Sequence, residues 1–309
     1  MKRFFLRYLK PLKDGFRYGN PLARYMVRRS ANRLVTPFTG FVLSQHFLSR
    51  EIGKLGFRWL APRSKDLAQH GSSEVVSQDV IYCQVDQLEE FYLEYLPRIT
   101  VPYVLITGKE SLPGLEDTET ARQVLKDPNL IAWFSQNQIF EHLDIQPFPY
   151  GVSVWKARSI EREARRARVL TRRRAVYLPY CSIHEHLPEG ARRLRKTLEP
   201  FMEPLEPFSQ YLRHLSESLF ILSPPGDRPD TYRHWEIIAT GGVPVSDLPP
   251  KLLEMFEGHV LQTENLGRFA APGDQAAEKL PRCIRSGSRI AEVNHWVHKI
   301  DESRNRFIQ

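Results

Sequence analysis

The sequence predicts an α/β protein with two Rossmann-like lobes in series, preceded by a basic, partly helical N-terminal extension. A chain of 309 residues is longer than one hydrophobic core usually serves, which favours two lobes. From Asp79 onward, short apolar runs typical of strands alternate with amphipathic stretches typical of helices, at the spacing of βαβ units. A second series of this kind begins near residue 175 with no internal sequence repeat, so the two halves share architecture only.

The first series predicts a parallel sheet with helical crossovers. Its first helix must stop before Pro97, because proline cannot continue a helix. The predicted strands are 79–85, 102–107, 130–134 and 145–150, and the predicted helices are 87–96 and 116–126.

The second series follows an Arg-rich helix predicted at 159–172. Its predicted strands are 175–180, 219–223, 241–245 and 259–262, and its predicted helices are 187–198, 207–218, 230–240 and 250–257. A last amphipathic helix carries Ile290, Val293, Val297 and Ile300 on one face. The predicted division is a basic extension at 1–72, an N-terminal Rossmann-like lobe at 73–157, a C-terminal Rossmann-like lobe at 158–285, and a helix at 286–309 that packs back across both lobes.

Cysteine usage and hydropathy limit the class of protein. Cys83, Cys181 and Cys283 are odd in number and far apart, which favours a reducing compartment over a disulfide framework or a zinc site. No stretch approaches the roughly 20 apolar residues that span a bilayer. The opening, residues 1–13, is short, cationic and amphipathic, and either lies in a membrane interface or docks on its own domain.

The net charge of +8 is concentrated in two basic stretches. Residues 1–65 hold fifteen Lys/Arg and two Asp/Glu, and residues 156–196 hold thirteen Lys/Arg and four Asp/Glu, so the rest of the chain is acidic. Such stretches indicate a polyanionic partner: anionic lipid, a phosphorylated substrate or nucleic acid. Nucleic acid is the weakest of the three, because no zinc-finger, RNP or helix-turn-helix signature accompanies the charge. The arginines of 162–174 form either a solvated helix face or part of such a surface.

The segment 222–245 holds the most informative motif. An apolar strand ends in a tight loop, and a helix begins with Asp230 or Thr231 as its N-cap. A helix N-terminus at the carboxyl edge of a parallel sheet favours phosphate, because its free NH groups and its dipole attract an anion. Arg233 in the first turn and Glu236 three residues later share a face. They form either a site for phosphate and ribose hydroxyls or a surface ion pair.

The motif S-P-x-G-x-x-x-D-x-x-R-x-W-E followed by G-x-[IV]-P-[IV] resembles the exostosin-like glycosyltransferases of the GT-B fold. The resemblance covers roughly residues 78–262 and includes the stretches 91–97, 103–106, 133–137 and 147–151. The motif itself consists of Ser223, Pro224, Gly226, Asp230, Arg233, Trp235, Glu236, Gly242, Pro244 and Val245.

The resemblance implies that the C-terminal lobe holds a nucleotide-sugar donor. Glu236 would bind ribose or sugar hydroxyls, Arg233 and the NH groups after Asp230 would bind the diphosphate, and Ser223 with Gly226 would allow close approach of the loop. A glycan or glycolipid acceptor would bind the N-terminal lobe. Neither a metal nor a cofactor is implied, since the helix dipole and the arginine stabilise the leaving nucleoside diphosphate.

An inverting transferase also needs a general base near the acceptor hydroxyl. Glu110, Glu141 and His142 are the candidates, with Glu110 and His142 taken as the catalytic pair to test; a structural role for His142 is the alternative. The chain departs from the family here: Gly108-Lys-Glu-Ser111 replaces a His-Asn-Ser-Asp type of loop, and Leu143 replaces a proline. After Glu236, Ile237 replaces a small residue.

The function expected from these observations is a metal-independent glycosyltransferase of surface polysaccharide synthesis, cytoplasmic and resting on the inner membrane face. The alternative is a non-catalytic GT-B-like scaffold, bound to a membrane surface through its basic N-terminus. A nucleic-acid-binding protein is the third reading.

Overall fold

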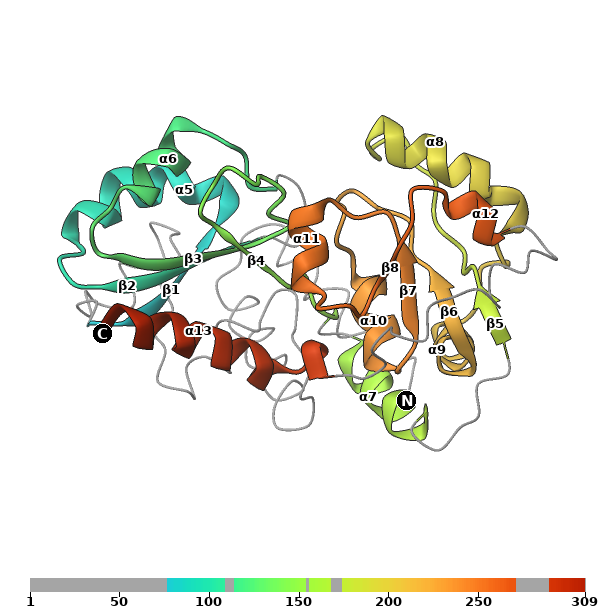
Figure 1. The fold of residues 1–309 in the computed structure, drawn as a ribbon. Coiled ribbons are helices and arrows are strands. Elements are labelled where there is room, and N and C mark those ends of the chain that lie inside the picture. The colour runs from blue at the N-terminus through green and yellow to red at the C-terminus, as the bar shows by residue number, and fades with distance from the viewer. Residues whose placement is uncertain (1–76, 109–113, 154–155, 168–173, 271–288, 309) are drawn as a thin grey trace, which may run out of the picture. The chain divides into compact units, whose positions relative to one another are not determined.

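The computed structural model describes residues 77–108, 114–153, 156–167, 174–270 and 289–308 (Figure 1). Within these ranges the strands form two parallel sheets, each with four strands in chain order. The prediction of an α/β protein with parallel sheets is therefore confirmed. The predicted N-terminal extension, 1–72, lies outside the described residues.

The N-terminal sheet consists of β1 (Asp79–Gln84), β2 (Tyr103–Gly108), β3 (Leu130–Gln136) and β4 (Gln146–Phe148). Ile81 pairs with Leu105, and Leu105 pairs with Trp133, so the same face of three strands carries large apolar side chains. Every residue of β2 is buried. A strand covered on both faces needs a continuous apolar run rather than alternation, which is what its sequence provides.

Helices cover both faces of this sheet (Figure 1). On one face, Trp133 packs with Phe91 and with Val124 of α6 (Glu119–Leu125), whose cap is Thr118. The predicted helix 87–96 is broken into α5 (Leu88–Glu90), a π-helical turn (Phe91–Tyr95) and a 3-10 turn (Leu96–Arg98) that includes Pro97. On the other face lies α13 (Val293–Ile308), in contact with β3.

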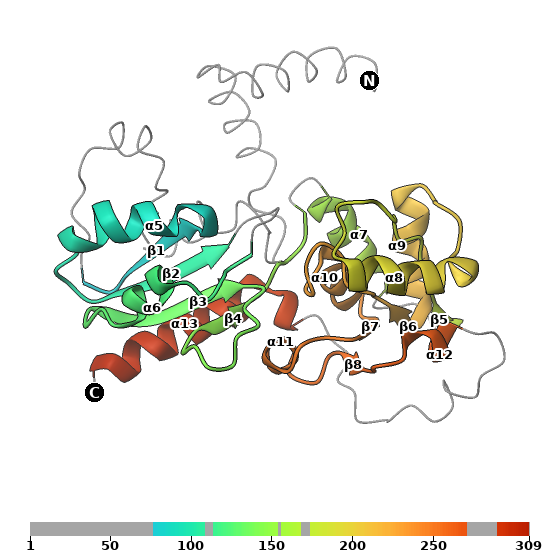
Figure 2. The same cartoon turned by 90° about the horizontal axis from the view of Figure 1, so that it is seen from above.

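The C-terminal sheet consists of β5 (Arg174–Tyr177), β6 (Ser218–Leu222), β7 (Val243–Ser246) and β8 (Leu261–Gln262). Phe220 and Leu222 pack on Leu198 of α8 (Glu189–Leu198) and Leu266 of α12 (Leu266–Ala270), a helix that the sequence pattern does not predict. α9 (Phe208–Glu217) contacts β5 and β6, and α10 (Tyr232–Ala239) contacts β7. Figure 2 shows these helices from a second side.

The Gly-Gly-Val-Pro-Val stretch, residues 241–245, connects α10 to β7 and forms the start of that strand. Gly241 follows the C-cap residue Thr240 with φ 80°, a left-handed conformation that glycine adopts without strain. A Cβ at Gly242 would lie 2.6 Å from Ile221 Cδ1 and 3.0 Å from Ile237 Cγ2, so a larger residue there would force these side chains to shift.

Two more helices complete the described fold: α7 (Ala157–Ala167), which packs against α9 and α10, and α11 (Pro250–Met255). Trp296 of α13 is 1% exposed, and its ring contacts Phe148 of β4 and Trp235 of α10. No helix in the described ranges is both long and apolar enough to cross a membrane.

Candidate functional site

The start of α10 is fixed to the ends of β6 and β7 by a chain of hydrogen bonds. Thr231, the N-cap residue, donates its backbone NH to His234 Nδ1 at 3.1 Å. Because Nδ1 accepts, Nε2 carries the proton and donates to Ser246 Oγ at 3.0 Å; Ser246 in turn donates to the carbonyl of Ser223 at 2.7 Å. The helix N-terminus is therefore held at the carboxyl edge of the sheet.

Asp230 joins this helix start to the N-terminal half of the chain. Its side chain is 1% exposed and accepts hydrogen bonds from the backbone NH of Tyr150 and from Trp235 Nε1, each at 2.9 Å. Asn137, directly after β3, bonds reciprocally to the backbone of Asp230, at 2.7 Å to its NH and 3.2 Å to its carbonyl. The carboxylate of this predicted site residue is thus occupied by protein donors, which fix where α10 begins.

Arg233 extends from the first turn of α10 toward the loop after β5. Its Nη1 donates to Cys181 Sγ at 2.6 Å, and its Nη2 donates to the carbonyl of Tyr180 at 2.8 Å. Its Nε is buried and has no hydrogen-bond partner among the described residues. No ion pair with Glu236 forms in the described part of the chain, so the surface ion pair predicted as the alternative is wrong.

Arg195 on α8 lies beside this group, although no sequence pattern predicts it. It is 7% exposed and donates from Nε to the carbonyl of Pro225 at 2.9 Å and from Nη1 to the carbonyl of Ser182 at 2.7 Å. Burial lowers the pKa of Arg195, and the nearby charge of Arg233 lowers it further. Within the described ranges, neither arginine has a carboxylate within 4.0 Å. Two neighbouring cations without a carboxylate favour an anionic ligand.

The loop after β6 comes close to these arginines. A Cβ at Gly226 would lie 3.2 Å from Arg195 Nη2 and 3.3 Å from Thr231 Cγ2, so a larger residue there would crowd both. Ser223 is fully buried, and its Oγ has no hydrogen-bond partner among the residues described. Buried polar atoms are normally hydrogen-bonded, so an unsatisfied hydroxyl at the start of the loop that Arg195 contacts at Pro225 suits a ligand.

Glu236 lies one turn further along α10 and is 4% exposed. Tyr211 of α9 donates to its Oε2 at 2.8 Å, and Lys156 Nζ lies 3.9 Å from its Oε1. In the described structure, Oε1 accepts no hydrogen bond. Burial raises the pKa of Glu236, while Lys156, the bond from Tyr211 and Arg233 oppose that rise. A buried carboxylate oxygen without a donor can accept a bond from a ligand hydroxyl.

Of the three residues considered as a general base, His142 is the one with a defined geometry. Its Nε2 lies 2.6 Å from Asp117 Oδ2, and Arg122 donates to both oxygens of Asp117, at 2.9 and 2.8 Å. Hydrogen bonds from Arg122 and His142 hold the pKa of Asp117 well below its usual range. Glu141 is exposed, and Glu110 lies outside the described residues.

The Arg-rich segment forms an amphipathic helix, α7. Ile160 and Ala164 are buried on its inner face, whereas its outer face is formed by exposed Arg158, Arg162, Arg165 and Arg166. Arg165 pairs with Glu161 at 2.6 Å. Arg174 at the start of β5 pairs with Glu203, and the arginines of 168–173 lie outside the described residues.

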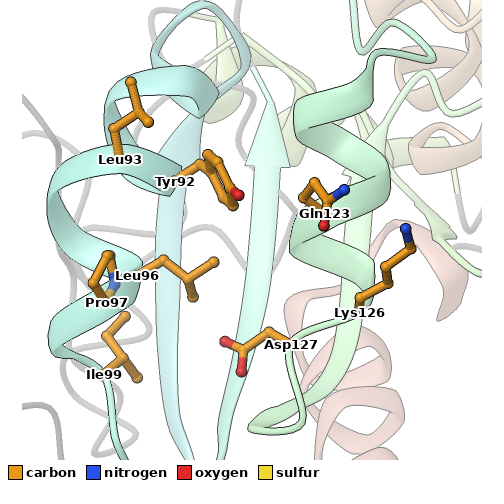
Figure 3. Close-up of a pocket in the computed structure, with 8 residues that line it drawn as sticks. All are labelled: Tyr92, Leu93, Leu96, Pro97, Ile99, Gln123, Lys126 and Asp127. Carbon is orange, nitrogen blue, oxygen red and sulfur yellow. The ribbon is translucent and has the colours of Figure 1, made fainter.

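A groove of about 510 Å³ lies elsewhere, between the segment 92–99 and α6 (Figure 3). Figure 3 shows Tyr92 and Leu96 on one wall facing Gln123 of α6 across the groove. None of the predicted site residues lines it. Within the described ranges, no three His, Cys, Asp or Glu side chains are grouped to hold a metal ion.

Four further residues, each from a different segment, contact Arg233, Glu236 or the loop after β6: Arg195, Cys181, Tyr211 and Lys156. No protein-family model matches this chain, and no curated protein sequence matches it either.

Proposed function

We propose that this protein is a metal-independent glycosyltransferase of the GT-B type, which moves a sugar from a nucleotide-sugar donor to a glycan or glycolipid acceptor. One observation carries the proposal. Arg195 and Arg233 lie near each other with no carboxylate within 4.0 Å among the described residues, and Oε1 of Glu236, one turn beyond Arg233 on α10, accepts no hydrogen bond there. The exostosin-like motif at 223–245 supports the same assignment.

The donor is bound through its diphosphate and its hydroxyl groups. Arg195 and Arg233 neutralise the diphosphate, Ser223 Oγ donates to a phosphate oxygen, and the N-terminus of α10 adds its positive dipole end. Glu236 Oε1 accepts a bond from a ribose or sugar hydroxyl. Burial raises the pKa of Glu236, and Lys156 and the hydrogen bond from Tyr211 oppose that rise, which favours the acceptor form of the carboxyl.

In the transfer step, the acceptor oxygen attacks the anomeric carbon of the donor sugar, and the bond from that carbon to the diphosphate oxygen breaks. The nucleoside diphosphate leaves with the bonding electron pair, and the two arginines stabilise its additional negative charge. The acceptor proton passes to a base. His142 is the proposed base, because its contact with Asp117 leaves Nδ1 to accept the proton.

Donor binding tests the proposal. Thermal shift with UDP-, GDP- and CMP-sugars should show stabilisation by at least one donor, as expected for a ligand that binds only the folded state. Glu236→Ala and Arg233→Ala should each reduce the shift, while the exposed Glu254→Ala on α11 should not. No shift with any donor, together with no effect of Glu236→Ala, would contradict the enzyme assignment.

A second candidate function is a scaffold bound to an anionic membrane surface through the basic N-terminus, and the exposed arginines on the outer face of α7 would add to this attraction. Near an anionic bilayer each Lys or Arg contributes about 1 kcal/mol. Under this reading vesicle binding survives Arg233→Ala and Glu236→Ala, and deletion of residues 1–30 abolishes it. Steeply salt-dependent binding to RNA or DNA in place of vesicles would instead favour a nucleic-acid-binding protein. A peripheral position on the inner membrane face, with the acceptor supplied there, would combine both proposals.

A further inference from the structure

The loop between β5 and α8, residues 178–188, is held directly by the two arginines of the site. Arg233 Nη2 donates to the carbonyl of Tyr180, and Arg195 Nη1 donates to the carbonyl of Ser182. Between them, the Cys181 thiol is 1% exposed and accepts from Arg233 Nη1. Three consecutive residues of this loop are therefore fixed to the proposed phosphate site.

Tyr180 differs from both of its neighbours. Pro179 and Cys181 are buried, whereas Tyr180 is 43% exposed. A single exposed aromatic residue needs no explanation by itself. Tyr180 is distinctive because the arginine proposed to bind phosphate also holds the backbone that carries its ring. A ring on a pinned loop loses little conformational freedom when a ligand binds to it.

We propose that Tyr180 is the platform on which the base of a nucleoside diphosphate stacks. This inference rests on the proposed function, since it assumes that the diphosphate lies at Arg195 and Arg233. Once the arginines hold the diphosphate and Glu236 the hydroxyls, the base is the remaining part of the ligand without a partner. A base has an uncharged, planar face, which an aromatic ring covers and which stacking recognises in every base.

Two other rings in the same loop provide controls. His184 lies 3.8 Å from Asp227, and His186, with 82% of its side chain exposed, lies beside Glu185. Within the described part of the chain, neither histidine bonds to Arg195 or Arg233 through its side chain or its backbone carbonyl. His186→Ala is therefore the matched control for the loss of an exposed ring from this loop.

The test compares two ligands on the full-length protein at one salt concentration: inorganic pyrophosphate, which has no base, and UDP, with GDP as a second nucleotide. Calorimetry on Tyr180→Ala should show nucleotide affinity reduced roughly 5- to 100-fold, the loss of one base–aromatic stack, with pyrophosphate affinity unchanged. Tyr180→Phe should bind nucleotide within about twofold of the parent, because it keeps the ring. His186→Ala should bind both ligands normally.

The inference is overturned if Tyr180→Ala binds UDP and GDP as the parent does, or if it loses pyrophosphate and nucleotide affinity equally. The second result would show that the substitution disturbs the phosphate loop rather than a stack. If the parent binds neither ligand, the proposed function fails and the inference fails with it. If the parent binds pyrophosphate and nucleotide equally well, the result supports the phosphate site and contradicts the proposal that Tyr180 stacks on the base.

Discussion

Two buried polar clusters lie at the ends of parallel strands, one in each sheet, and they differ in how completely their atoms are paired. In the N-terminal sheet, Trp133 donates to Thr107 Oγ1 at 2.9 Å and Thr107 donates to Ser135 Oγ at 2.8 Å. At the C-terminal sheet, Ser223 Oγ directly after β6 and Glu236 Oε1 on α10 are buried without a hydrogen bond from any described residue. A fully paired cluster stabilises the fold, whereas atoms left unpaired in a buried site are suited to a ligand. The first cluster is therefore expected to control stability and the second to control binding.

Asp230→Ala should have the largest effect on stability, because the buried Asp230 carboxylate joins the start of α10 to Tyr150 in the N-terminal half of the chain. The substitution removes the carboxylate that accepts from the Tyr150 NH and from Trp235 Nε1, at about 1–3 kcal/mol for each lost hydrogen bond. Urea unfolding should therefore show a loss of roughly 2–6 kcal/mol. The exposed Asp144→Ala is the control and should change little. A loss below 1 kcal/mol would mean that this buried carboxylate does not support the start of α10.

Arg195→Gln should weaken pyrophosphate binding, and it should also lower the free energy of unfolding, because the carbonyls of Pro225 and Ser182 lose their donor. Hydrogen bonds to charged groups contribute about 1.5–3 kcal/mol, which corresponds to roughly 10- to 150-fold in affinity. Arg193→Gln is the matched control, since Arg193 is exposed on the same helix. Equal affinity in the two variants, measured by calorimetry, would remove Arg195 from the binding cluster.

Thr107→Val should show the opposite behaviour. It keeps the shape of the side chain but leaves Trp133 Nε1 and the Ser135 hydroxyl without their partner, at about 1–3 kcal/mol of unfolding free energy. Thr107→Ser keeps the hydroxyl and should recover most of the loss. Nucleotide affinity should stay unchanged in both variants. A large change would contradict the assignment of stability to one cluster and of binding to the other.

Glu236→Gln should give the smallest effect, and its sign is diagnostic. Burial raises the pKa of Glu236 in the folded state above its value in the unfolded chain, so the folded state binds the proton more tightly. In the parent protein, the free energy of unfolding therefore falls as pH rises through the pKa of Glu236 in the unfolded chain and then its pKa in the folded state. The variant has a neutral glutamine and does not show this fall. The variant should thus unfold at a higher temperature at pH 7, by about 2–4 °C for each kcal/mol gained. The gain should disappear below about pH 4, where the unfolded carboxyl is protonated. Glu254→Gln, an exposed control, should show no such pH dependence.

The sequence was sufficient to predict the strands and most helices, because apolar periodicity reports burial directly. It predicted one continuous helix at 87–96, where a π-helical turn at Phe91–Tyr95 interrupts the pattern, and it contained no signal for α12, a helix of five residues. The neighbourhood of Arg233 and Glu236 on one helix could be predicted from their spacing. The contacts of Arg195 and Tyr211 could not, because each lies on a different helix and meets the site only through the tertiary fold. Spacing also could not show that Arg233 bonds to Cys181 whereas Glu236 accepts from Tyr211.

The placement of α13 has a consequence for the order of events during synthesis on the ribosome. Trp296 covers Phe148 and Trp235, and Ile300 is fully buried, yet both are translated long after β1–β4 have emerged. Among the described residues, the cover of this face of the N-terminal sheet is thus made only after the whole C-terminal sheet. The cluster on the opposite face, from Ile81 to Ile145, is complete much earlier in the chain. The two faces of one sheet are therefore expected to be buried at different times during synthesis.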